Sequence, residues 1–133
     1  ILGKNTYYND PDEYEIQLDL TPEDIDHLIK AKNALSEVNS MLITTTTDFD
    51  SNNICEFIFG DNTGFSNKIS YQMNGKITDN AISIPFDSDI FKDILNSNKD
   101  QDSGTLKLSK TGVLKLNFMS DDIKSEYFVA RNE

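Results

Sequence analysis

The first residues that could carry chemistry are the oxygen donors Asp48, Asp50 and Asn52, which stand at alternate positions. This spacing is typical of the start of an EF-hand calcium loop. In such a loop the sixth residue is glycine and the twelfth is a glutamate that binds the ion through both carboxylate oxygens. Here those two positions hold Asn53 and Phe59, so the loop lacks both its sharp turn and its strongest ligand. The sequence therefore predicts a turn at this point and no metal site.

A thiol nucleophile would need a base, and the chain has one cysteine, Cys55, and one histidine, His27. Cys55 stands in the apolar run 54–59, which is typical of a small buried hydrophobe. The segment 60–64 lacks the Gly-Lys-Ser/Thr ending of a phosphate-binding loop and indicates a turn. No pair among the 23 acidic residues has a spacing that suggests acid–base catalysis. We expect a protein with no catalytic residues and no cofactor.

The composition fits a single domain with a real core, because 37% of the 133 residues are apolar. One cysteine excludes an internal disulfide framework, which predicts the reducing interior of a cell. No window of about 18 apolar residues is present, so we expect no membrane span. The start at Ile1 without an apolar leader favours a piece of a longer protein.

The formal net charge of −11 is the strongest signal in the composition. Binding to nucleic acid needs Lys and Arg at the phosphates, so the total alone indicates an acidic, well-solvated domain. An acidic body with its basic residues gathered on one face would still touch DNA on that face alone. The placement of the lysines is therefore more informative than the total.

Alternating apolar residues predict a strand over 14–20, and the residues after it predict a helix. Thr21 is a good N-cap, Pro22 suits the first helical position, and Asp24 is placed to complete a capping box. The helix is expected to end near Leu35. Its apolar stripe consists of Ile25, Leu28, Ala31 and Leu35.

Three further strands are expected after this helix, at 41–48, 54–59 and 68–73. Asn74-Gly75 predicts a type I′ hairpin turn after the last of them. The same order of elements then begins again. The second set is a strand at 81–86, an N-cap at Asp87-Ser88, a helix with the stripe Ile90, Phe91, Ile94 and Leu95, and strands at 105–109, 113–119 and 126–130.

The two halves of the chain match when one is shifted by about 66 residues along the other. Leu18 and Leu20 then fall on Ile84 and Phe86. The sequence thus predicts an α+β domain made of two β-α-β-β-β units. The units span about 14–78 and 79–133.

This doubled unit resembles a domain of the DNA polymerase sliding clamps. The resemblance rests on the strand-to-helix segments 18–30 and 82–95 and on the closing segment 112–131, which looks like the last hairpin and tail of proliferating cell nuclear antigen. The short, divergent character is similar to clamps of T-even-type bacteriophages, which implies a place in the cytoplasm or nucleoid, including that of a virus-infected cell. The resemblance implies a C-terminal clamp domain over 14–133, with two helices on one face of antiparallel sheets, and residues 1–13 as the end of an interdomain connector.

Clamp helices line the hole of a ring around double-stranded DNA, so the resemblance implies a homo-oligomeric processivity factor that is not an enzyme. It also implies weak, non-specific attraction to phosphate on the helix faces opposite the apolar stripes, which we expect to be neutral to basic. Asp26, Glu37 and Asp93 depart from this pattern. The candidate DNA-facing residues are Lys30, Asn33, Lys92, Asn96 and Lys99, with Lys32 at the margin.

The resemblance further implies partners that insert a short hydrophobic peptide beside the connector and the tail, namely DNA polymerase and the clamp loader. The candidate pocket residues are Tyr7, Tyr8, Val129, Ala130 and Arg131. Clamp rings close by strand pairing, so we expect strand 67–73 at the edge toward the next subunit and 124–131 at the edge toward a first domain. The candidate edge residues are Lys68, Ile69, Tyr71 and Tyr127.

The alternative interpretation is a β-rich protein-interaction module that is unrelated to replication and binds through its acidic surface. The arrangement of the two helices distinguishes the two. A clamp domain places them side by side, with Lys30, Lys92 and Lys99 on one surface.

Overall fold

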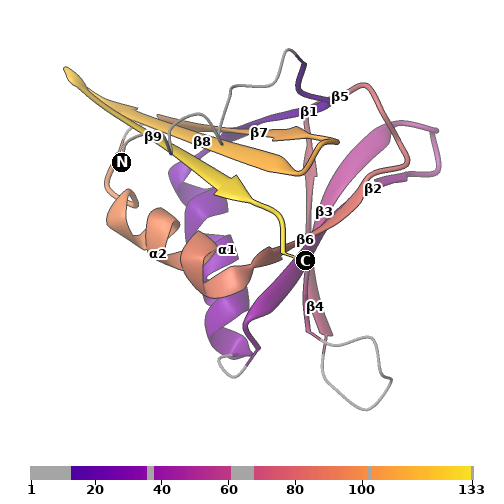
Figure 1. The fold of residues 1–133 in the computed structure, drawn as a ribbon, viewed down its shortest axis with the longest axis horizontal. Coiled ribbons are helices and arrows are strands. Elements are labelled where there is room, and N and C mark those ends of the chain that lie inside the picture. The colour runs from indigo at the N-terminus through magenta and orange to yellow at the C-terminus, as the bar shows by residue number, and fades with distance from the viewer. Residues whose placement is uncertain (1–12, 36–37, 61–67, 102, 133) are drawn as a thin grey trace.

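The structure is a computed structural model that describes residues 13–35, 38–60, 68–101 and 103–132. These residues form two antiparallel sheets and two helices, α1 (Pro22–Ala34) and α2 (Ser88–Ser97) (Figure 1). The five-stranded sheet has the order β5 (Lys76–Ile77), β1 (Ile16–Leu20), β7 (Ser103–Ser109), β8 (Val113–Ser120), β9 (Ile123–Ala130). The four-stranded sheet has the order β4 (Lys68–Asn74), β3 (Asn53–Gly60), β2 (Ser40–Thr47), β6 (Ser83–Asp87).

The two repeats exchange their first strands. β1 of the first repeat pairs with β7 of the second, with Leu18 opposite Leu106. β6 of the second repeat pairs with β2 of the first, with Ile84 opposite Ile43. The predicted pair of β-α-β-β-β units is confirmed, and the exchange explains why the two units make one domain: neither sheet is complete without a strand from the other unit.

Both helices begin as the sequence predicted. At α1 the Thr21 hydroxyl accepts a hydrogen bond from the Asp24 amide at 3.1 Å, and the Asp24 carboxylate accepts one from the Thr21 amide at 3.0 Å. At α2 the Asp87 carboxylate accepts from the amides of Asp89 and Ile90 at 2.9 and 3.0 Å. These side chains satisfy amides that have no partner within the helix, so each helix has a defined start.

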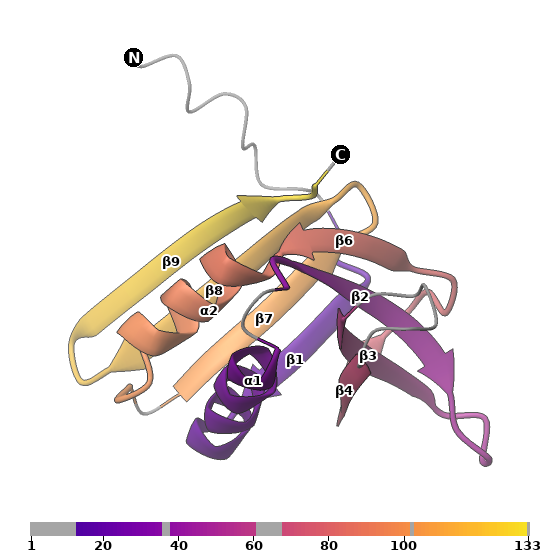
Figure 2. The ribbon, with the colours of Figure 1, turned by 90° about the horizontal axis from the view of Figure 1, so that it is seen from below.

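The helices lie side by side on the inner side of the two sheets, where their buried faces meet the sheets in one core (Figures 1 and 2). The predicted stripe of α1 is buried throughout, and in α2 Phe91 and Leu95 are buried. Phe91 stacks on Phe57 of β3, with ring centroids 6.0 Å apart. Ile90 is 48% exposed, so its assignment to the buried stripe is wrong. The sheets cover α2 from one side only, so the buried side of the helix is centred on Phe91 and Leu95, and Ile90 lies outside it.

The predicted hairpin turn at Asn74-Gly75 is also wrong. β4 and β5, on either side of it, belong to different sheets, so the chain changes sheets at Gly75. A β-carbon at Gly75 would lie 2.4 Å from Leu18 Cδ2 and 2.6 Å from the Gln17 carbonyl oxygen. The glycine is therefore needed for a close approach to β1. The two-residue strand β5 that follows, which the sequence analysis missed, pairs with β1 at Ile16 and Gln17.

Candidate nucleic-acid and partner interfaces

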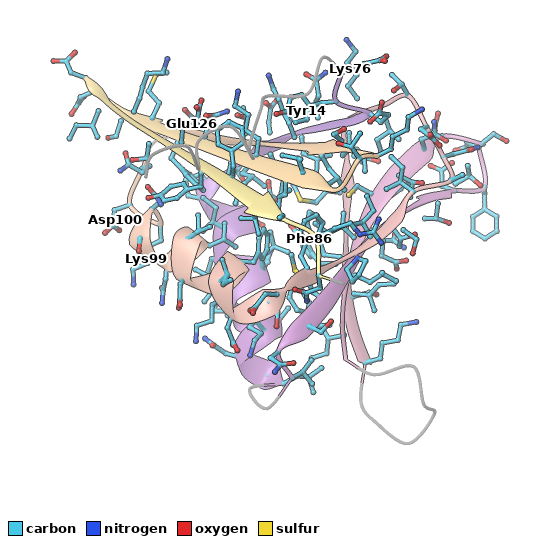
Figure 3. The ribbon with its side chains drawn as sticks, viewed as in Figure 1. Tyr14, Lys76, Phe86, Lys99, Asp100 and Glu126 are labelled. Carbon is cyan, nitrogen blue, oxygen red and sulfur yellow. The ribbon has the colours of Figure 1, made fainter. Side chains whose placement is uncertain are left out.

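The helix side of the domain holds the residues expected to face DNA. The structure brings α1 and α2 together, with Lys30, Asn33 and Asn96 exposed and Lys92 half-buried. Lys99 follows α2 and is exposed next to Asp100, at the opposite side of the molecule from Tyr14 and Lys76 (Figure 3).

The expected neutral-to-basic charge of this side is wrong for the two helices. Lys30 is 72% exposed, but its ammonium lies 2.9 Å from the Asp26 carboxylate. The exposed acidic residues Glu23, Asp26, Asp89 and Asp93 outnumber the lysines of α1 and α2. Glu23 and Asp89 lie in the first helical turns, where an acidic group interacts favourably with the helix dipole. Helix stability therefore accounts for part of the acidity.

Lys32 does not lie at the margin of an exposed face. Its side chain is 3% exposed, and its ammonium lies 3.1 Å from Asp89 Oδ1 of α2. The long aliphatic stem of lysine can lie in an apolar contact while the charged end reaches a partner. Lys32 therefore connects the two helices, and it is removed from the candidate DNA-facing set.

The two strands expected at sheet edges are edge strands. β4 ends the four-stranded sheet and β9 ends the five-stranded sheet, so the predicted positions are confirmed. On β4, Lys68 is exposed and Ile69 is half-buried. An edge strand leaves one row of backbone N–H and C=O groups available to a strand from another chain.

The two candidate edge tyrosines point toward the helices. The Tyr71 hydroxyl of β4 donates a 2.7 Å hydrogen bond to Asp24 of α1, and its ring lies 5.4 Å from that of His27. The Tyr127 hydroxyl of β9 accepts a 3.1 Å hydrogen bond from Asn98, the C-cap of α2. Each edge strand is thus joined to one helix by a tyrosine, which the period-two pattern of the strands did not predict.

The contact between Tyr71 and Asp24 changes the titration of both groups. Burial, together with the hydrogen bond to Asp24, raises the pKa of Tyr71 to about 12. Burial alone would raise the pKa of Asp24, but the hydrogen bonds from Tyr71 and Thr21 outweigh it and hold that pKa below its ordinary value. The pair is therefore a neutral phenol that donates to a carboxylate across most of the pH range.

Solved structures share this arrangement of helices and sheets. A Helicobacter pylori beta clamp bound to a DNA ligase peptide superposes with a TM-score of 0.59 at 16% sequence identity, over 92% of this chain and 31% of that one. The chain has the fold of a sliding-clamp domain. The same clamp in complex with diflunisal gives a TM-score of 0.63 at 16% identity over 92% and 32%, and in complex with carprofen 0.62 at 14% over 97% and 35%.

The clamp-domain fold was predicted from the sequence and is confirmed. The chain spans about a third of the length of those clamp chains, at 31%, 32% and 35%. No protein-family model matches the sequence, and no curated protein matches it.

The tail of the clamp domain bridges its two sheets. The Arg131 amide donates a 2.9 Å hydrogen bond to the Gly112 carbonyl, and the Asn132 amide donates one of 2.9 Å to the Pro85 carbonyl of β6. Val129 is buried in the core, so its side chain is not available to a peptide, whereas Ala130 and Arg131 are exposed. Tyr7 and Tyr8 lie outside the described residues.

The residues first considered for chemistry have structural roles in the described part of the chain. Asp48 accepts hydrogen bonds from the amides of Asp50 and Asn52 at 2.9 Å each and shapes the turn between β2 and β3. Cys55 is buried, as predicted, and burial raises the pKa of its thiol to about 12. Among the described residues, no three metal-ligating side chains gather, and neither helix is long and apolar enough to cross a bilayer.

Proposed function

We propose that this clamp domain is part of a ring that encircles double-stranded DNA and tethers a DNA polymerase to it. The observation that carries the proposal is the clamp-domain fold with an edge strand at the end of each sheet, β4 and β9. Strand pairing at these edges would join the domain to its neighbours: β4 to the next subunit, and β9 to a first domain, which the connector ending in residues 1–13 would link to this one. Lys68, Ile69, Tyr71 and Tyr127 belong to these two joints.

In this ring the helix side faces the DNA. Lys30, Asn33, Lys92, Asn96 and Lys99 supply a few phosphate contacts, and the acidic residues beside them keep the attraction weak. Weak attraction suits a ring that must slide. Retention depends on topology, so the function needs no covalent chemistry, no catalytic residue and no cofactor. Such a ring works where DNA is copied, in the reducing interior of a cell.

Partners of the ring would bind through a short hydrophobic peptide. The H. pylori clamp is known bound to a DNA ligase peptide, and we extend peptide binding to polymerase and clamp loader here. The tail residues Ala130 and Arg131, with Tyr7 and Tyr8 of the connector, are the proposed contacts. A hydrophobic peptide titrated into the labelled protein should shift the amide signals of Ala130 and Arg131 first. Shifts confined to α1 and α2 would contradict this assignment.

The proposed encirclement has a topological test. The protein is assembled on a nicked circular duplex, fixed by chemical cross-linking, and filtered in about 1 M salt, where the Debye length of about 3 Å removes electrostatic binding. A ring stays with the circle and leaves when a restriction enzyme makes the circle linear. The matched control is the same duplex made linear before assembly. Loss of the protein from the closed circle in high salt would refute encirclement.

A further inference from the structure

The outer face of the five-stranded sheet, which points away from the helices, carries a row of lysines. Lys76 and Lys107 stand on either side of Gln17, and Lys107 is directly opposite Lys115. Phe128 follows Lys115 in the same row. Neighbouring strands lie about 4.8 Å apart, so Lys76 to Lys115 covers about 14 Å. Three lysines in one cross-strand row are unexpected in a chain of net charge −11.

Like charges directly opposite each other destabilise a sheet unless something compensates them. The Lys115 ammonium lies 3.6 Å from the Glu126 carboxylate. The centre of the Tyr14 ring lies 5.9 Å from the Lys107 ammonium and 6.0 Å from the Lys115 ammonium. Among the described residues, Lys76 and Lys107 form no ion pair. The row therefore keeps a net positive charge, in contrast to the exposed residues of the two helices.

A hollow of about 300 Å³ lies between Lys76 and Lys107. It exists because β5 is only two residues long and because Gly75 carries no side chain where the chain changes sheets. Besides the two lysines, the amides of Gln17 and Asn74, the Thr105 hydroxyl and the Asp19 carboxylate line it. Two ammonium groups and several neutral donors suit a phosphate group, and Asp19 is the one feature that opposes it.

We propose that this outer face binds a single-stranded nucleic acid, with a phosphate in the hollow between Lys76 and Lys107 and a base against Tyr14. The half-buried rings of Tyr14 and Phe128 favour this occupant over an acidic peptide, because bases stack on aromatic rings and carboxylates do not. Figure 3 shows Tyr14 and Lys76 on the same side of the molecule, that of the five-stranded sheet, and Lys99 on the side of the helices. The inference does not rest on the proposed ring, in which duplex DNA passes on the helix side.

The test uses a fluorescently labelled oligo-dT of twelve nucleotides and the 133-residue chain, with anisotropy read in two salt concentrations. Each phosphate contact to a single strand contributes about −0.7 to the slope of the logarithm of the binding constant against the logarithm of the salt concentration. Two contacts therefore predict about sevenfold weaker binding in 200 mM than in 50 mM salt. Lys76→Gln or Lys107→Gln should reduce this factor to about threefold. Lys124→Gln, which removes the same charge from an exposed lysine of β9 outside the row, should leave it unchanged.

Two further variants separate the site from general loss of structure or charge. Asp19→Asn should tighten binding in both salt concentrations, a gain that misfolding cannot produce. Tyr14→Leu should weaken binding roughly fivefold or more while leaving the salt factor unchanged. Circular dichroism checks that each variant is folded.

Competition against the labelled oligo-dT identifies which class of ligand the surface binds. A blunt duplex of the same length, deoxythymidine monophosphate, inorganic phosphate and an oligoglutamate peptide should each bind more weakly than oligo-dT. If the duplex binds as tightly as oligo-dT, the proposed stacking of a base on Tyr14 is wrong. If either small phosphate binds as tightly, the surface is a site for small anions and the proposal of a nucleic-acid site is wrong. Equal binding of the peptide, or an equal effect of Lys124→Gln and Lys76→Gln, would overturn the proposal.

Discussion

Replacing Tyr71 by phenylalanine tests the contact that joins the edge strand β4 to α1. The variant keeps the ring beside His27 but removes the hydroxyl, which donates the 2.7 Å hydrogen bond to Asp24 and also lies 3.4 Å from His27 Nδ1. Hydrogen bonds to charged groups contribute about 1.5–3 kcal/mol, and the partly exposed carboxylate places this one near the lower end. We expect Tyr71→Phe to lower the free energy of unfolding at pH 7 by about 1.5 kcal/mol, measured by urea denaturation with an unchanged slope.

The pH dependence of this loss follows from the two pKa shifts. The pKa of folded Asp24 is lowered, so its contribution is complete above the ordinary value of 3.8 and declines as the pH falls through the folded pKa. The pKa of Tyr71 is raised from 10.0 to about 12, so its contribution is complete below pH 10 and declines as the pH rises toward 12. The difference between wild type and Tyr71→Phe should therefore be constant from about pH 5 to 9 and shrink in acid.

The matched control is Tyr127→Phe on the other edge strand. Its hydroxyl accepts from the neutral amide of Asn98, so the expected loss is about 1 kcal/mol and should not change between pH 3 and 7. A double-mutant cycle of Tyr71→Phe with Asp24→Asn isolates the pair from the role of Asp24 in the capping box. A loss below about 0.5 kcal/mol at pH 7 would refute the assigned contact, as would a loss of full size at low pH.

Three further predictions concern single positions. Gly75→Ala should destabilise the domain by about 2 kcal/mol in urea denaturation, because the new methyl would meet the Gln17 carbonyl at 2.6 Å; an unchanged midpoint would contradict the close approach. Cys55, with a thiol pKa of about 12, should react with a disulfide reagent at pH 8 about a thousandfold more slowly than free cysteine, and rapid labelling of the folded protein would disprove its burial. Thr21→Ala should cost about 1 kcal/mol of stability through loss of the α1 cap, whereas Thr21→Ser should cost less than half of that.

The repeat and the helix starts could be predicted from the sequence because local rules govern them. Thr21 and Asp87 are good caps whatever surrounds them, and alternation marks most strands without knowledge of their partners. Gly75 shows where local rules fail. Asn74-Gly75 has the composition of a hairpin turn, but the approach of β1, more than fifty residues earlier in the chain, decides the role of the glycine.

The candidate site was less predictable because its charges depend on long-range neighbours. Lys32 looked exposed on its own helix and is buried by α2. The lysine row on the outer face could not be seen in the sequence, since Lys76, Lys107 and Lys115 become neighbours only through the pairing of β5, β1, β7 and β8. The two tyrosine contacts also join residues that lie 47 and 29 positions apart.

The exchange of first strands between the repeats has a consequence for synthesis of the protein. β1 leaves the ribosome well before its partner β7, which begins at Ser103, so β1 must wait for the whole stretch between them before it can pair there. Until then the nascent chain holds an apolar strand without its sheet, a period in which contact with another unfinished chain competes with folding. The same exchange gives two finished chains a route to swap halves, with β6 and the elements after it completing the sheets of a partner. Slow, concentration-dependent refolding is the expected signature of this topology.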